Sequence, residues 1–172
     1  MDAVLRLHRM WLSTPSEGRQ AELHGAPLNK EHFEGTDLRR LLAPEASFHQ
    51  SRFYDADLSG SELAGAQFYH ARLHHSRLRE VNARAANFTG ARLDHCDFSG
   101  ASLAGASFFR AELTQCIFRD ADLQGCDFRE VRMRGGDFRG ANLGGTAGLT
   151  REQIAQAITD RATTLPQATC LR

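Results

Sequence analysis

Large apolar residues recur at every fifth position over most of this chain of 172 residues. Of the eleven phenylalanines, all except Phe109 occupy positions whose number ends in 3 or 8. Positions ending in 1 or 6 mostly carry Ala, Ser or Cys, and many glycines fall at multiples of five. A period of five fits neither an α-helix, which repeats every 3.6 residues, nor a strand, which alternates every two. The chain must therefore turn a corner once per repeat.

Four such corners close a square coil of twenty residues. The large residue and the small residue two positions before it point into the coil, and the glycine supplies the backbone freedom that a corner needs. From Phe48 to Leu143 the repeat makes five full coils, and the earlier repeats add about one more. Stacked at the spacing of neighbouring strands, six coils predict a rod of roughly 25 to 30 Å.

The unit of small, polar, Leu or Phe, polar, and Gly or polar residues resembles that of the pentapeptide repeat family over residues 21–145. The resemblance implies an all-β solenoid, a right-handed quadrilateral β-helix. Residues 1–20 are then expected to form an N-terminal capping helix and linker, and residues 146–172 a C-terminal helix and tail, because an open solenoid exposes sheet edges at both ends.

Both expected caps are helical. The first covers residues 2–12, with Trp11 packed on the first coil. A capping-box sequence starting at Thr150 predicts the second, which runs to about Asp160 with Ile154 and Ile158 on one apolar face. Some gyrase-protecting members of the family dimerise through their C-terminal ends, so the resemblance leaves open whether this end caps one rod or joins two as a homodimer.

Composition narrows the functional classes. The 21 Lys and Arg residues balance the 21 Asp and Glu residues, so the chain lacks the overall charge that nucleic-acid binders and acidic mimics usually carry. No run of apolar residues is long enough to span a membrane, and the N-terminus does not read as a signal peptide, which favours the cytoplasm and no membrane partner. Four cysteines without paired spacing are interpreted as free thiols: Cys96, Cys116, Cys126 and Cys170.

Charge can still gather on one face of the rod, because residues twenty apart stack above one another. One outward column and its neighbour are rich in arginine: Arg52, Arg72, Arg92, Arg132 and Arg134. This face is either a solvated surface, partly paired with Glu112 and Asp94, or a docking strip for an acidic partner or a phosphate-bearing ligand.

Three apolar side chains are expected on the outside of the rod, and each is either an ordinary exposed residue or a partner contact: Tyr69, Phe109 and Ile117. The chain shows no glycine-rich phosphate loop, nucleophile elbow or set of metal ligands at fixed spacing. The neighbouring histidines His74, His75 and His95 are interpreted as surface residues. We therefore expect no enzyme activity, no cofactor and no metal.

The leading hypothesis is a non-enzymatic protein-interaction or scaffold module that displays ladders of residues to a protein partner. The alternative comes from the family resemblance, because some pentapeptide repeat proteins resemble B-form DNA, bind type II topoisomerases such as DNA gyrase, and protect against quinolones or toxins. Neutrality and the arginine-rich face count against such a mimic. Direct binding of nucleic acid through that face is a weaker hypothesis still.

Overall fold

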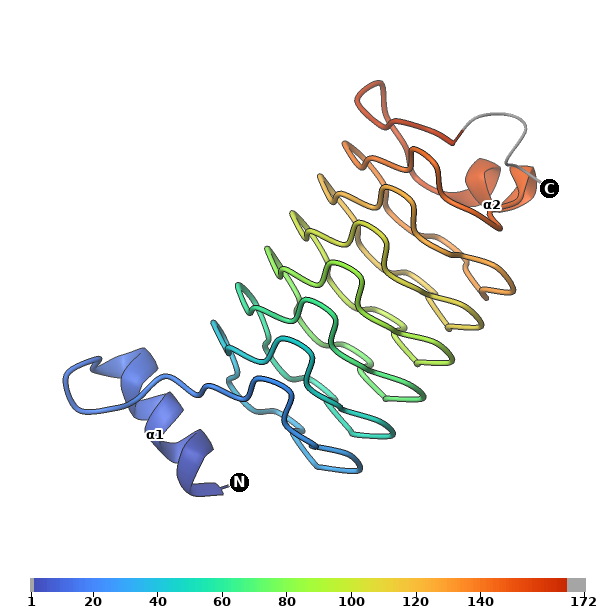
Figure 1. Ribbon diagram of the computed structural model, residues 1–172. Helices are drawn as coiled ribbons and strands as arrows, with labels where there is room; N and C mark the ends of the chain where they lie inside the picture. Colours follow the sequence, from blue (N-terminus) through green and yellow to red (C-terminus); the bar gives the residue numbers. More distant parts are fainter. Residues whose placement is uncertain (1, 167–172) are drawn as a thin grey trace.

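The chain folds as a right-handed quadrilateral β-helix, as a computed structural model that describes residues 2–166 shows (Figure 1). Helix α1, Asp2–Ser13, lies at the N-terminal end of the rod, and helix α2, Arg151–Gln156, lies at the C-terminal end. Each rung is a single-residue parallel bridge, and from Glu22 to Ala147 every bridge joins residues twenty apart. Neither helix of the described chain is long and apolar enough to cross a bilayer.

Main-chain hydrogen bonds tie each coil to the next in a fixed pattern. Phe68 donates its N–H to Asn87 O at 2.7 Å, and Asn87 donates its own N–H back to Ala66 O at 2.9 Å. A third bond, from Ala71 N to Phe68 O at 2.9 Å, closes the turn within the coil. The same pattern recurs on all four sides, so one register of twenty residues is imposed on every column.

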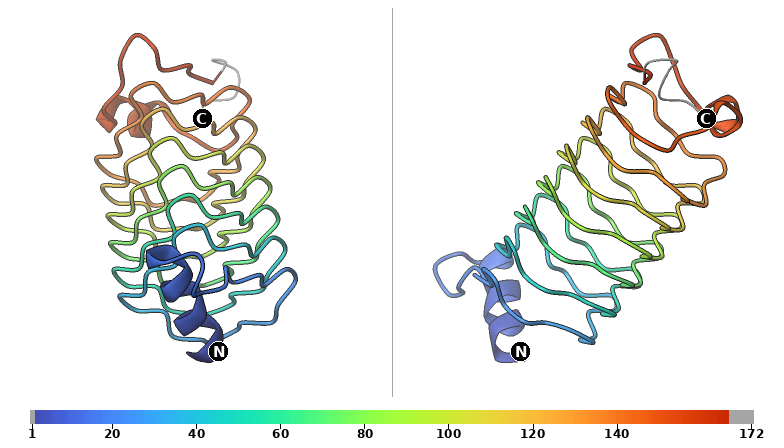
Figure 2. Two further views of the ribbon diagram at one scale, coloured as in Figure 1. Left: turned by 90° about the vertical axis from the view of Figure 1, so that its left-hand side faces the viewer. Right: turned by 45° about the vertical axis from the view of Figure 1, so that its right-hand side comes forward.

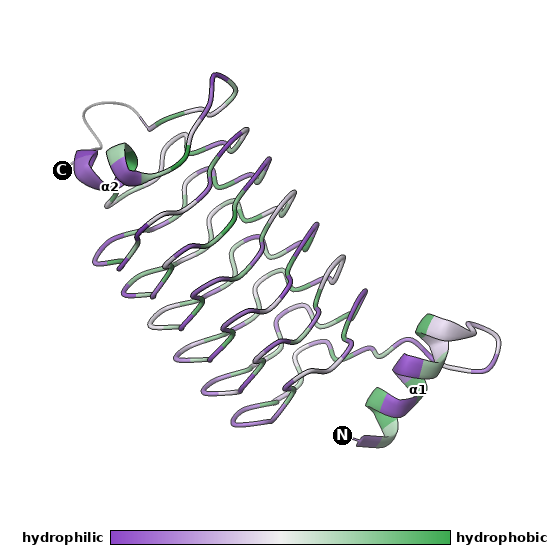
Figure 3. Ribbon diagram, turned by 180° about the vertical axis from the view of Figure 1, so that it is seen from behind, coloured by the Kyte–Doolittle hydropathy of each residue, from purple (hydrophilic) through white to green (hydrophobic). Residues whose placement is uncertain are grey.

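The interior is filled by the side chains at the five-residue positions. Phe48, Phe68, Phe88 and Phe108 are fully buried, and their rings stack with centroid distances of 4.9 to 5.2 Å. The inward position predicted for the large residue of each repeat is therefore confirmed, and these stacked rings belong to the core. Figure 3 shows hydrophobic and hydrophilic residues alternating around every coil.

Small residues two positions before each centre also point inward, and those with a donor use it. Ser61 Oγ donates to Leu38 O at 3.0 Å, and Cys116 Sγ donates to Leu93 O at 3.0 Å, each reaching back 23 residues. Ser and Cys are thus interchangeable in this slot. Cys96, Cys116 and Cys126 are free thiols, and burial raises the pKa of Cys126 to about 12. Cys170 lies outside the described residues.

Every corner uses the left-handed backbone conformation. All residues at multiples of five from 25 to 145 have positive φ, and fourteen of them are not glycine. Glycine is therefore not required at the corners, although it relieves the strain that a Cβ atom creates there. The twenty-residue register is stable enough to hold Ala85 at φ 54° and Glu80 at φ 54°.

The N-terminal helix is held on the first coil mainly by His8, which the sequence analysis did not single out, and Trp11 contacts the same coil through Arg40. His8 is fully buried, its Nε2 lies 2.9 Å from Arg39 O, and its Nδ1 accepts from Ala21 N at 3.0 Å. Trp11 is only half-buried and lies between the His8 ring and the Arg40 guanidinium. His8 suits this position because its two ring nitrogens can form hydrogen bonds with two main-chain groups at the edge of the first coil.

The C-terminal helix ends at Gln156 and does not run to about Asp160. Figure 2 shows it as a short helix at the C-terminal end of the rod. Ile158 leaves the helix because its N–H donates to Gly136 O at 2.8 Å and its carbonyl accepts from Phe138 N at 2.7 Å. The predicted apolar face shared with Ile154 is therefore wrong: Ile154 packs partly against the core, and Ile158 stays half exposed. Residues 147, 158 and 164 continue the ladder past Gly145.

We predict that Ala85→Gly stabilises the rod, because glycine adopts the left-handed corner conformation without the steric strain that the Cβ atom of Ala85 causes. The expected gain in the free energy of unfolding is roughly 0.5 kcal/mol, since the lost strain exceeds the added chain entropy. The matched control is Ala104→Gly, one residue before a corner and without positive φ, which should destabilise by a similar amount. Urea unfolding followed by circular dichroism measures both. A destabilised Ala85→Gly variant would contradict the proposed strain.

The contact of α1 with the rod should depend on pH through His8. Burial lowers the pKa of His8 below its ordinary 6.5, although the hydrogen bond to Arg39 O and the charge of Asp37 oppose this. The neutral ring is the form that accepts from Ala21, so its contribution is complete above pH 6.5 and is lost as the pH falls below that value. Trp11 is the single tryptophan and reports the change by fluorescence. His8→Gln should abolish this titration, and a transition that persists in that variant would exclude His8.

Candidate interaction face

One outward column of the rod, which we call the arginine ladder, consists of His32, Arg52, Arg72, Arg92, Glu112 and Arg132. Parallel bridges join successive members, so the register predicted from the sequence is confirmed. All of these side chains are exposed except that of Glu112, which is half-buried. Neighbouring coils lie about 4.8 Å apart, which brings the arginines of the column close to one another.

The C-terminal half of the ladder compensates its own charge. Glu112 lies between two arginines, with its carboxylate 3.5 Å from Arg92 Nε and 3.5 Å from Arg132 Nη1. On the adjoining corner, Arg110 Nε contacts Glu130 at 2.7 Å. Arg92 and Arg132 therefore belong to an ion-pair network, and this half of the column agrees with the first interpretation, a surface partly paired with Glu112.

The N-terminal half is different. Among residues 2–166, neither Arg52 nor Arg72 forms an ion pair with a carboxylate, and the same holds for Lys30 on the adjoining corner. A shallow groove runs between the two columns, with a volume of about 470 Å³ and no carboxylate in its lining. We call it the basic groove, and its lining residues are Lys30, His32, Gln50, Arg52, His70 and Arg72.

Sequence reasoning missed the half of this groove that comes from the corner column. Lys30, Gln50 and His70 stand at multiples of five, where the repeat pattern suggested only turns. Their left-handed φ values of 54° to 63° fix how they leave the corner, and twenty-residue spacing stacks them beside the ladder. Comparing adjacent columns across a corner, instead of one column at a time, would have found them.

His70 marks the boundary between the two halves. Its ring lies over Gly90, where an added Cβ would come within 2.5 Å of the imidazole, and its Nδ1 is 3.3 Å from Gly90 O. The ring lines the basic groove on one side and the ion-paired section, with Arg110 and Glu112, on the other. Within residues 2–166, the one carboxylate contact of a groove residue is that of His32, whose Nδ1 lies 3.3 Å from Glu34.

The remaining predicted site residues lie elsewhere. Arg134 is exposed and forms no ion pair within the described chain, but it lines a separate hollow near Met133 and Gln153. Tyr69 is exposed beside His70, at a ring-centroid distance of 4.1 Å, and therefore adjoins the basic groove. The structure thus brings Arg52, Arg72 and Tyr69 together but separates Arg134 from them.

Phe109 and Ile117 are only half-buried on the outside of the rod. The guanidinium groups of Arg110 and Arg129 both lie over the Phe109 ring, at 4.8 and 5.7 Å from its centroid. Phe109 thus lies outside the core, as expected, and its ring is partly covered by these cation–π contacts. Ile117 stands in the column between Asp97 and Asp137.

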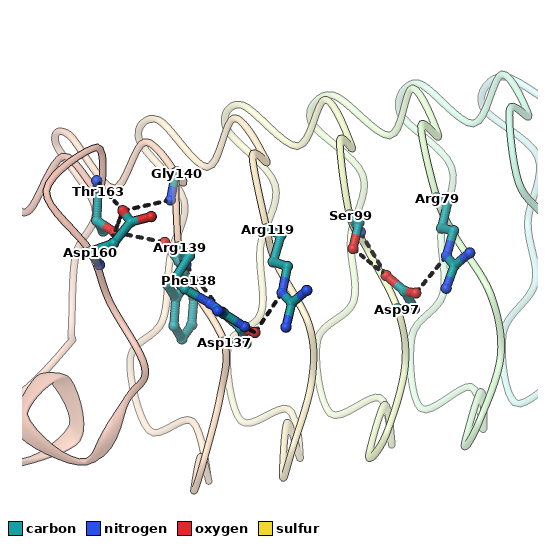
Figure 4. Close-up of polar contacts among 10 residues, drawn as sticks. All are labelled: Arg79, Asp97, Ser99, Arg119, Asp137, Phe138, Arg139, Gly140, Asp160 and Thr163. Carbon is teal, nitrogen blue, oxygen red and sulfur yellow. Dashed lines mark hydrogen bonds and ion pairs between the residues drawn. The ribbon is translucent and has the colours of Figure 1, made fainter.

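A DNA mimic would need a column of free acidic side chains. The column that contains Asp57, Asp97 and Asp137 carries aspartates, but Asp97 and Asp137 are engaged in structural bonds (Figure 4). Asp97 and Asp137 are buried, and each accepts from an arginine of the preceding coil, Arg79 or Arg119, at 2.6 Å. A bond from Arg139 holds the pKa of Asp137 far below its ordinary value, although burial opposes this. These carboxylates also accept main-chain N–H groups at the turns, for example from Ser99 to Asp97 at 3.0 Å.

The histidines on the far side of the ladder make contacts with each other and with an acid. His75 and His95 stack with a centroid distance of 4.7 Å, and His74 Nδ1 lies 3.3 Å from Asp94. Within residues 2–166 no group of three or more His, Cys, Asp or Glu side chains is placed to hold a metal ion.

Comparison with known proteins adds evidence on the family and the fold. A family model described as a pentapeptide repeat region matches residues 26–109, and one described as pentapeptide repeats, in eight copies, matches residues 106–145. No curated protein matches the chain.

Solved structures share the architecture. HetL, a pentapeptide repeat protein involved in heterocyst differentiation regulation in the cyanobacterium Nostoc sp. strain PCC 7120, is 23% identical with a TM-score of 0.50. That alignment covers 91% of this chain and 77% of HetL. A trypsin-treated form of QnrB1, a plasmid-mediated fluoroquinolone resistance protein, is 17% identical with a TM-score of 0.50 and coverages of 90% and 83%. At these identities the likeness concerns the fold.

Proposed function

Because the chain belongs to the pentapeptide repeat family, we propose that it is a non-enzymatic interaction module whose rigid rod presents the N-terminal half of the arginine ladder to an acidic protein partner. The observation that carries this proposal is the pair of stacked arginines, Arg52 and Arg72, which no carboxylate of the described chain neutralises. Fold alone does not determine function, so the argument rests on this site.

The charge pattern of the rod supports a functional role for these two stacked arginines. Ten arginines of the described chain are paired with carboxylates, including several that reach across to a neighbouring coil. Stacking two like charges one coil apart, with Lys30 beside them, is unfavourable unless an anion compensates them. An acidic surface of a partner would supply that charge.

The interior supports binding over chemistry. Stacked phenylalanines and leucines with no exposed surface fill the coil, so the hollows described here lie on the outside of the rod. A rod with a packed core holds its outward side chains at a fixed spacing of about 4.8 Å along each column. Fixed spacing lowers the entropic cost of presenting several charges to one partner.

The test is capture of binding proteins from native lysate by the full-length chain. Arg52→Glu/Arg72→Glu should lose the partners that the unmodified protein captures, because it replaces attraction of an acidic surface by repulsion. The control Arg134→Glu/Arg151→Glu makes the same charge change at the C-terminal end and should retain them. Equal capture by all three proteins, with unchanged thermal unfolding, would remove the basic face from the proposal.

Binding to a type II topoisomerase as a DNA mimic is the second candidate, supported by the rod-like fold shared with QnrB1. A mimic must present unpaired negative charge along its length. Here Asp97 and Asp137 are buried and bonded to Arg79, Arg119 and Arg139, so they offer little field to an enzyme that reads DNA phosphates. The structure favours the acidic-partner proposal over this one.

We therefore expect no effect of the chain on DNA gyrase. In a supercoiling assay, micromolar protein should neither inhibit the enzyme nor restore its activity in the presence of a fluoroquinolone. QnrB1 is the positive control, because it is a fluoroquinolone resistance protein of the same fold. Protection comparable to that by QnrB1 would replace the acidic-partner proposal with the topoisomerase alternative.

A further inference from the structure

The basic groove has the composition of an anion site. It is lined only by groups that can donate a hydrogen bond or carry positive charge: two guanidinium groups, one ammonium group, two imidazoles and one amide. Arg52 and Arg72 occupy successive rungs, about 4.8 Å apart, so both forks can reach one small anion between them. Lys30 lines the same groove from the adjoining corner column.

The groove is short. It spans three successive coils, about 10 Å along the rod, from the level of Lys30 to that of His70 and Arg72. Beyond it the same face carries Glu112 and Glu130, each bound to arginine. A continuous polyanion such as a nucleic acid would run from the groove onto these carboxylates, and a chain of zero net charge offers it no long-range attraction. One compact group of high charge fits this length better.

From these observations we propose that the basic groove binds the phosphate group of a phosphorylated protein segment, with Arg52 and Arg72 as the principal donors and Lys30 as a third cation. A phosphorylated side chain carries a charge of about −1.5 to −2 and three acceptor oxygens, which matches two arginine forks better than one carboxylate does. Tyr69, exposed beside His70, provides an aromatic surface for the residue next to the phosphate. This inference rests on the proposed function and specifies the chemistry of its partner.

The experiment is an NMR titration of the full chain, observing the arginine side-chain Nε–H resonances. The probe is a short glycine peptide with one central phosphoserine, and inorganic phosphate is titrated separately to show whether the bare anion suffices. We expect saturable shifts at Arg52 and Arg72 with both probes and none at Arg132. Arg52→Gln or Arg72→Gln should weaken peptide binding by about tenfold, whereas the control Arg132→Gln should leave it unchanged.

Four outcomes would overturn the proposal. They are absence of saturable shifts, equal shifts at all exposed arginines, equal affinity for the same peptide with glutamate in place of phosphoserine, and tighter binding of a single-stranded oligothymidylate that the same substitutions weaken. The last would indicate a nucleic-acid site. None of these results tests whether the rod captures a protein partner, so failure here leaves the capture experiment to decide the proposed function separately.

Discussion

The ladder of main-chain hydrogen bonds between residues twenty apart is the interaction on which the rest of the structure depends. Wherever two coils meet, one bond runs in each direction between them, as Phe68 N to Asn87 O and Asn87 N to Ala66 O illustrate. The pattern admits no change of register between Glu22 and Ala147. Three features follow from keeping that register: the left-handed corners, the stacked phenylalanines, and the hydrogen bonds from inward serine and cysteine side chains to the preceding coil.

The ladder also explains how charge is arranged on the surface. Because columns are fixed, a residue type that recurs every twenty positions is stacked directly on itself, and like charges then meet at the distance between strands. Over most of the rod, ion pairs offset this repulsion between like charges, as between Arg119 and Asp137 or around Glu112. The basic groove departs from this arrangement, which is why it stands out as a site.

The fold could be predicted from the sequence because the repeat is unbroken and its period admits few backbone solutions. The five-residue repeat and the twenty-residue coil also predicted which residues point inward and which stack in outward columns. The ends were harder to predict, because their structure depends on contacts that no repeat encodes. His8 is the buried contact of the first helix in addition to Trp11, and Ile158 joins the ladder instead of the helix. Ion pairing was predicted in part: Glu112 pairs with Arg92 and Arg132, whereas Asp94 contacts His74 instead of an arginine. Only half of the basic groove could be predicted from the sequence, because Lys30, Gln50 and His70 belong to a different column from Arg52.

The register has a consequence for how such a gene can change in length. Duplication of a twenty-residue segment lengthens the rod by one coil and leaves every face with its own residues in line. Duplication of a single five-residue repeat rotates all later residues by one side of the coil, a quarter of a turn. Inserted between Arg52 and Arg72, five residues would move Arg72 onto the neighbouring face and dismantle the groove, while the core pattern and the fold would remain intact.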